Sequence, residues 1–575
     1  MKIYFFWIKI VILSYRNCVF IYFLPFLLIT ACGSAPETSR RNSGNTEAQI
    51  MQQLSGGLAE EIRNLTESGI LSSMLQAIEL INSRGLSNSE FGRLMTGVNI
   101  VLIRLVYPDS LARLPIPDFP QTSNYTRIIR EAERGIYTRP PENSTDFLEY
   151  ILPFLAFSNI TENGILMDVL RDLMRANSLK PNSIFPSYFS GLIYERFGRY
   201  NEAFNAYRQA SRISSECYSA QIGAARVRMI TGNPREAVSI LSDLVIRYPD
   251  SMIIKRELAI AFYSDGNFSR ALPAINEILL VEPRDGELLL MRASILIEQG
   301  QYAQANVSLD SYAPINQHNR MYLYMRARVQ AEGNRNRDAA LNYLRSILRS
   351  NPDDIEAMIY TATLLMESTR ASDQTEGREL LVRLNRLAGS SFEVISLNLK
   401  DAVHRESWRE AQVFLNQILA VRRTVGDLID AYYIERGLGN NARALTYARE
   451  LYDRDNSNHD YTSIYISSLI DNNRRDEASR LLESRFLTAG SGQVRSRYYF
   501  LRSRLQTNQE AALNDLRSSL FEDPRNLDAI IAMFEIYHNR REERRAVYYL
   551  RQALAIAPDN PRLRRYEIEY AHLLR

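Results

Sequence analysis

Ten alanines recur at a nearly constant spacing through the C-terminal two-thirds of the chain. The successive steps are 34, 34, 34, 35, 71, 33, 34, 34 and 34 residues. The step of 71 equals two periods plus three residues, so we expect one degenerate repeat around residues 355–390. A fixed period of this length predicts stacked supersecondary units, each burying its apolar face against its neighbours. The ten residues are Ala203, Ala237, Ala271, Ala305, Ala340, Ala411, Ala444, Ala478, Ala512 and Ala546.

Residues at fixed offsets from these alanines resemble the tetratricopeptide repeat family. That family places small residues and aromatics around a turn glycine within a pair of helices. The first repeat supplies, in order, Gly191, Tyr194, Gly198, Tyr200, Ala203, Tyr207 and Ala210. Prolines also stand twelve residues after five of the alanines, at Pro249, Pro283, Pro352, Pro524 and Pro558.

The resemblance covers residues 184–559 and implies eleven tetratricopeptide repeats, including the degenerate one. Because each repeat is a helix-turn-helix, the implied fold is all-α, a right-handed α-solenoid with a concave inner face. The glycine permits a tight turn after the first helix, and the alanine lets the two helices cross closely. We interpret residues 560–575 as a C-terminal capping helix with a polar outer side.

Residues 50–183 show helical patterns that do not match the repeat motif. Ser87 and Glu90 predict a capping box before an apolar run. A second helical pattern covers residues 145–157. This region is either a set of degenerate hairpins that continue the solenoid or a separate small helical domain, and we favour the hairpins.

Residues 1–31 are typical of a lipoprotein signal peptide, with cations before an apolar run. The run ends Leu-Ile-Thr-Ala and is followed by Cys32, which resembles a bacterial lipobox. The resemblance implies cleavage before Cys32 and attachment of lipid, including palmitate-type acyl chains, to that residue. An uncleaved transmembrane anchor and a cleaved soluble form are the alternatives.

The residues after the cysteine bear on localisation. Gly33 follows Cys32 directly, and by the same resemblance this favours the outer membrane, at its periplasmic face rather than at the cell surface. Residues 32–49 are rich in small and polar side chains, which predicts a flexible tether. Two or more acyl chains would anchor the protein stably.

The charge balance argues against nucleic acid as a partner. The chain has 69 Lys and Arg residues and 66 Asp and Glu residues. The surplus lies entirely in residues 1–31, which contain Lys2, Lys9 and Arg16 but no acidic residue. The rest of the chain is balanced, whereas phosphate binding requires a basic surplus.

Motifs that would indicate catalysis or metal binding are missing from the sequence. It contains no P-loop, no dinucleotide-binding glycine motif and no hydrolase nucleophile motif, and its five histidines are too far apart for HExxH. Cys217 is the one cysteine left after Cys18 and Cys32, so neither a disulfide nor a cysteine zinc site is expected in the mature chain. We expect no enzymatic activity, no cofactor and no metal.

The repeat register predicts a binding groove on the first helix of each repeat. Arginine and tyrosine dominate the energetic hot spots of protein interfaces, and both occur at positions that the family pattern places on the concave face. The predicted groove residues are Tyr188, Arg226, Arg256, Tyr263, Tyr433 and Arg436.

These features predict a lipid-anchored scaffold that binds protein partners of the cell envelope in its concave groove. A surface-exposed adhesin that binds host molecules is one alternative. A cell-wall or outer-membrane assembly factor, with any enzymatic activity carried by residues 50–183, is another.

Overall fold

The structure is a computed structural model that describes residues 56–110, 115–121, 123–486, 488–490, 492–558 and 560–574. Cys32, the signal peptide and the predicted tether lie outside these ranges. Within them the chain forms helices joined by turns and contains no strand, which confirms the predicted all-α repeat fold. Two compact units divide the chain, one ending at Arg335 and the other beginning at Asn336.

The first unit begins with helices of unequal length. The predicted capping box at Ser87 and Glu90 was wrong, because Ser89 is the residue that caps the helix. Its hydroxyl accepts a hydrogen bond from the Gly92 amide at 3.0 Å, whereas the Ser87 hydroxyl donates to Asn82. The helices are α3 (Gly56–Ser68), α4 (Leu71–Ser83), α5 (Glu90–Val106), α6 (Asn124–Glu133), α7 (Phe147–Ile151), the 3₁₀ helix η2 (Leu152–Asn159) and α8 (Asn163–Leu179).

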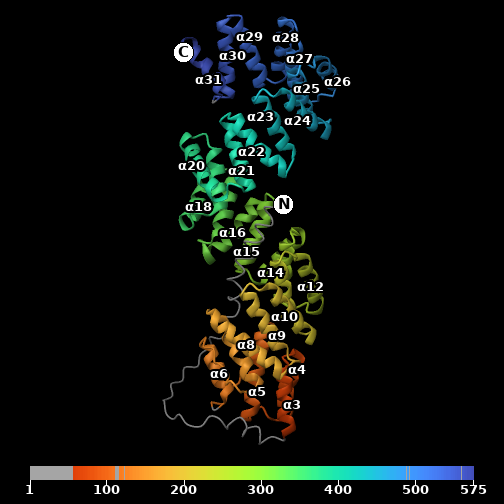
Figure 1. Ribbon diagram of the computed structural model, residues 1–575, viewed down its shortest axis with the longest axis vertical. Helices are drawn as coiled ribbons and strands as arrows, with labels where there is room; N and C mark the ends of the chain where they lie inside the picture. Colours follow the sequence, from red (N-terminus) through yellow and green to blue (C-terminus); the bar gives the residue numbers. More distant parts are fainter. Residues whose placement is uncertain are drawn as a thin grey trace. The chain divides into compact units, whose positions relative to one another are not determined.

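Regular helical hairpins follow in the same unit, and we call their first and second helices A and B helices (Figure 1). Successive A helices contact one another, for example α9 with α11 and α11 with α13, so they form a layer of their own. The hairpins are α9 (Ile184–Arg196) with α10 (Tyr200–Ile213), α11 (Tyr218–Ile230) with α12 (Pro234–Arg247), α13 (Met252–Ser264) with α14 (Phe268–Val281), and α15 (Gly286–Glu298) with α16 (Tyr302–Asn316). The unit ends with α17 (Arg320–Arg328) and the π-helical turn η3 (Val329–Gly333).

The second unit begins with α18 (Arg337–Ser350) and continues with hairpins of the same kind. These are α19 (Ile355–Met366) with α20 (Ala371–Ala388), α21 (Phe392–His404) with α22 (Trp408–Val421), α23 (Val425–Gly437) with α24 (Asn441–Arg454), α25 (His459–Asp471) with α26 (Arg475–Phe486), α27 (Gly492–Leu505) with α28 (Gln509–Glu522), and α29 (Leu527–Asn539) with α30 (Glu543–Ile556). Two short helices, α31 (Pro561–Glu569) and α32 (Ala571–Leu574), close the described chain.

In most hairpins the turn from the A helix to the B helix contains one residue in the left-handed backbone region, although the α19–α20 and α27–α28 turns contain none. Five glycines hold this position, with φ between 71° at Gly198 and 84° at Gly232. Other residues take it in four hairpins and also have positive φ, namely Arg335, Glu406, Asn473 and Arg541. Because a Cβ is strained at such φ values, glycine is the favoured residue and the other four are tolerated at a cost.

The degenerate repeat is explained by Gly377. This residue stands 34 positions before Ala411, and a Cβ there would lie 2.7 Å from Met366 Cγ, so α20 crosses α19 at a small residue as the other B helices do at alanine. The extra three residues lengthen α20, which begins six residues before Gly377, whereas α22 begins three residues before Ala411.

The N-terminal helices share one hydrophobic core with the first repeats. The Tyr107 hydroxyl donates to the Gly69 carbonyl at 3.0 Å, and the Ser219 hydroxyl of α11 donates to the Val106 carbonyl of α5. A Cβ on Gly69 would also meet Ile184 of α9 at 2.6 Å. The described N-terminal helices therefore pack directly against the first repeats.

Candidate functional site

In the first unit, the two arginines predicted to line the groove form ion pairs within the A-helix layer. Arg226 of α11 pairs with Glu195 of α9, with 3.3 Å between Nε and Oε1. Arg256 of α13 pairs with Asp285 at 2.7 Å and with Glu287 at 2.6 Å, both at the start of α15. Their side chains are only 14% and 12% exposed. Both arginines therefore tie neighbouring repeats together.

The two predicted groove tyrosines of the first unit are also built into the packing. Tyr188 and Tyr263 are each 6% exposed. Burial raises the pKa of Tyr188, and its ring lies 6.1 Å from the ring of Tyr207. The Tyr263 hydroxyl lies 3.1 Å from Ser294 Oγ on α15, which links two successive A helices.

In the second unit, the predicted residues Tyr433 and Arg436 of α23 are far more exposed. Tyr433 keeps 49% of its surface exposed, and the Arg436 side chain keeps 43%. Arg436 Nε lies 3.2 Å from Asp471 Oδ2 on α25. Of the large aromatic side chains exposed in the described ranges, Tyr433 is the one on an A helix, since Phe521 and Tyr548 lie on B helices.

Side chains from other A helices act on the Tyr433 hydroxyl. Its pKa is raised first by burial, then by its neighbour Tyr432 and by the carboxylate of Asp528 on α29, while Arg436 and Arg497 oppose the shift. Tyr433 and Asp528 are 95 positions apart in the sequence, yet they interact. Charged groups of α23, α27 and α29 therefore act electrostatically on one exposed tyrosine.

Sequence reasoning missed three charged residues of this surface. Arg497 and Asp528 occupy register positions that the repeat pattern assigns to the concave face, so the same mapping applied to every repeat would have found them. Asp430, one helical turn before Tyr433, has no such signal. Burial, followed by the charge of Asp427, raises the pKa of Asp430, and Lys400 opposes the rise.

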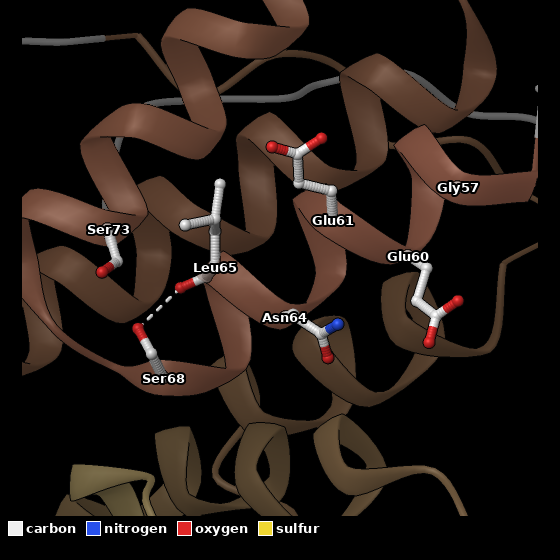
Figure 2. A pocket seen from close by; sticks show the side chains of 7 residues that line it. All are labelled: Gly57, Glu60, Glu61, Asn64, Leu65, Ser68 and Ser73. Atoms are coloured by element: carbon white, nitrogen blue, oxygen red, sulfur yellow. Dashed lines mark hydrogen bonds between the residues drawn. The ribbon is translucent and has the colours of Figure 1, made fainter.

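A shallow hollow of about 400 Å³ lies on the N-terminal hairpin (Figure 2). It is lined by α3 and the start of α4, and the Ser68 hydroxyl donates to the Leu65 carbonyl at 2.7 Å inside it. The carboxylates of Glu60 and Glu61 point away from each other in this view. The hollow is open to solvent and brings no nucleophile and base together.

In the described part of the chain, no group of three or more His, Cys, Asp and Glu side chains is placed to hold a metal ion. No helix in those ranges combines the length and the apolar character needed to cross a bilayer.

Tetratricopeptide repeat family models match residues 187–217 and residues 256–305. The chain is 28% identical over 125 residues to a protein of Treponema pallidum (strain Nichols) named "Uncharacterized lipoprotein", a match that covers 22% of this chain and 64% of the relative. It is 26% identical over 113 residues to the human protein O-mannosyl-transferase TMTC1, covering 19% of this chain and 13% of the relative. The matches thus span less than two thirds of either relative.

Solved structures of repeat proteins also resemble the chain at low similarity. Pseudomonas aeruginosa pilF is 18% identical with a TM-score of 0.34, covering 38% of this chain and 97% of its own. YrrB, described as a TPR protein with an unusual peptide-binding site, is 17% identical with a TM-score of 0.28, covering 32% and 95%. Cut9-Hcn1 of the APC/C is 12% identical with a TM-score of 0.32, covering 90% and 93%.

Proposed function

Because this chain is a tetratricopeptide repeat protein, we propose that it acts as a lipid-anchored, non-enzymatic scaffold that binds protein partners of the bacterial cell envelope. The repeats themselves support a role in protein–protein interaction. The observation that favours the A-helix layer as the binding surface is the exposed Tyr433 surrounded by charges from α23, α27 and α29. Exposed tyrosine among charged groups is typical of interface hot spots.

Two findings support the lipid anchor. The sequence places Cys32 directly after an apolar segment, in a lipobox-like context. The chain is also similar over 125 residues to a spirochaete protein named as a lipoprotein. We propose that lipid on Cys32 holds the protein at the outer membrane, facing the periplasm.

Metabolic labelling with an alkyne fatty acid tests the anchor. We expect label in the full-length protein and none in the Cys32→Ala variant, because the thiol is the acceptor. Cys217→Ala is the matched control and should keep the label, since that thiol is fully buried. A wild-type protein without label would contradict lipidation.

Affinity capture tests the scaffold function. Full chain extracted from membranes in a neutral detergent would be immobilised and incubated with envelope extract over a range of concentrations. We expect a protein partner whose capture saturates and is competed by soluble, unlabelled chain. Capture that only rises linearly, with no competition, would contradict the scaffold function.

The surface-exposed adhesin remains the second candidate, because lipidation alone does not determine which side of the outer membrane the protein occupies. Protease treatment of intact cells separates the two. A periplasmic scaffold is protected until the outer membrane is permeabilised, whereas an adhesin is degraded at once.

A further inference from the structure

The exposed ring of Tyr433 shares one helix face with an acidic side chain. Asp430 precedes Tyr433 by three residues on α23, and residues three apart lie on the same face of a helix. Asp430 has no hydrogen bond or ion pair with another described residue. The cation whose charge acts on it, Lys400 of α21, is already close to Glu367, at 3.9 Å between Nζ and Oε1.

A second carboxylate, on another helix, acts electrostatically on the Tyr433 hydroxyl. It belongs to Asp528, which lies in the first turn of α29 and is exposed. Among the described residues it too forms no hydrogen bond or ion pair.

The arginines near Tyr433 already have acidic partners, unlike these two carboxylates. Arg497 of α27 pairs with Asp460 of α25. Arg436 and Arg504 both pair with Asp471, so they share one carboxylate. With Asp430 and Asp528 included, four carboxylates therefore face three arginines, a surplus of one negative charge.

We propose that this A-helix surface of the second unit binds an arginine-bearing segment of a partner protein, with the guanidinium over the Tyr433 ring and its charge facing Asp430 and Asp528. Arginine fits better than lysine, because its planar group stacks on aromatic faces and is more weakly hydrated. An acidic partner would meet the carboxylates of Asp430 and Asp528, and the two arginines that act on the Tyr433 hydroxyl, Arg436 and Arg497, already have acidic partners. The inference rests on the proposed scaffold function and specifies the chemistry of its partner.

Fluorescence anisotropy with a synthetic peptide tests this assignment. The probe is a fluorescein-labelled nonapeptide with three Gly-Ser-Arg units. Its controls replace each arginine by citrulline, which keeps the shape without the charge, or by glutamate. The full chain in neutral detergent should bind the arginine peptide at least about tenfold more tightly than the citrulline peptide, since three guanidinium groups lose their charge.

Variants then locate the site. Tyr433→Leu, Asp430→Asn and Asp528→Asn should each weaken arginine-peptide binding about two- to fivefold, in line with exposed cation–π and ion-pair contributions. Asp453→Asn on α24 is the matched control, because Asp453 is 63% exposed on a B helix, and its affinity should stay unchanged. Circular dichroism would confirm that each variant remains folded.

Three results would overturn the proposal: equal binding of the arginine and citrulline peptides, tighter binding of the glutamate peptide, or equal effects of Asp453→Asn and the three surface variants. These failures are distinguishable from failure of the scaffold function. Saturable capture of an envelope protein combined with no preference for arginine would leave the scaffold function standing and remove only this partner chemistry.

Discussion

Replacing Gly223 with alanine places a methyl group against the fully buried ring of Tyr207. This ring, from B helix α10, inserts between Gly191 of its own A helix and Gly223 of the next one. A Cβ would lie 2.5 Å from the ring at Gly191 and 2.6 Å from it at Gly223. The Tyr207 hydroxyl also donates to Glu195 Oε2 at 2.6 Å, so the ring is held at both ends.

The magnitude follows from two opposed effects. Alanine favours a helix interior by up to about 1 kcal/mol over glycine, so an unobstructed substitution would stabilise α11. Overpacking a closed core costs about 1–3 kcal/mol, and the Tyr207 ring has no space in which to retreat. We therefore expect Gly223→Ala to destabilise the contact between α10 and α11 by about 1–2 kcal/mol. Gly164→Ala in α8, where a Cβ meets nothing within 4 Å, should not destabilise the protein.

Hydrogen exchange measured by mass spectrometry suits this test, because repeat arrays open locally and a single global unfolding energy is not well defined. Peptides from α10 and α11 should exchange faster in Gly223→Ala. The Tyr207→Leu variant lacks the ring. In that background, Gly223→Ala should lower the free energy of local opening of α10 and α11 by at least about 1 kcal/mol less than it does in the wild type. The same cost in both backgrounds, or slower exchange in the single variant, would refute the reasoning.

The remaining predictions concern three single positions. Gly300→Ala should destabilise the α15–α16 hairpin by about 1 kcal/mol in hydrogen exchange, because φ is 71° there although a Cβ would meet no other atom. Glu406→Gly should instead stabilise its hairpin by up to about 1 kcal/mol in the same assay, because it relieves the backbone strain at φ 53° and removes an exposed side chain that forms no hydrogen bond or ion pair with another described residue. Burial raises the pKa of the Cys217 thiol to about 12, so iodoacetamide should not modify it in the native protein at pH 8 but should do so in urea. Because the pKa of the unfolded thiol is near its ordinary value of 9.0, this group's contribution to stability should be fully present below that pH and lost as the pH rises towards 12. Hydrogen exchange is too fast at high pH, so the measurement is the midpoint of the urea transition that exposes Cys217, at pH 8 and pH 10.5, with Cys217→Ala as reference.

The repeat period predicted the helical hairpins well because it records a packing requirement that recurs in every unit. A small residue is needed wherever a B helix crosses its A helix, and the alanines mark those crossings. Gly377 is not part of the alanine series, although it lies at the crossing of α20 with α19. Glycine is small enough for that close approach, but it does not match a pattern defined by alanine. The capping box failed because Ser87 and Ser89 are both suitable caps, and only the path of the chain decides between them.

The candidate groove was less predictable than the fold. The register identifies which residues face the A-helix layer, but it cannot show whether their charges are already paired. Arg226 and Arg256 are arginines at register positions that the family pattern places on the concave face. Their guanidinium groups nevertheless form ion pairs, Arg226 with Glu195 and Arg256 with Asp285 and Glu287. Pairing of this kind depends on residues about 30 positions away, which adjacent repeats bring together only after folding.

Photocrosslinking in cells tests the central claim most directly, namely that the A-helix layer of the second unit binds a protein partner. A photoreactive amino acid would replace Tyr433 on A helix α23 or, as the matched control, Tyr548 on B helix α30, which is 57% exposed. We predict a discrete crosslinked protein from position 433 and none from position 548. No adduct at position 433, or the same adducts from both positions, would contradict the account.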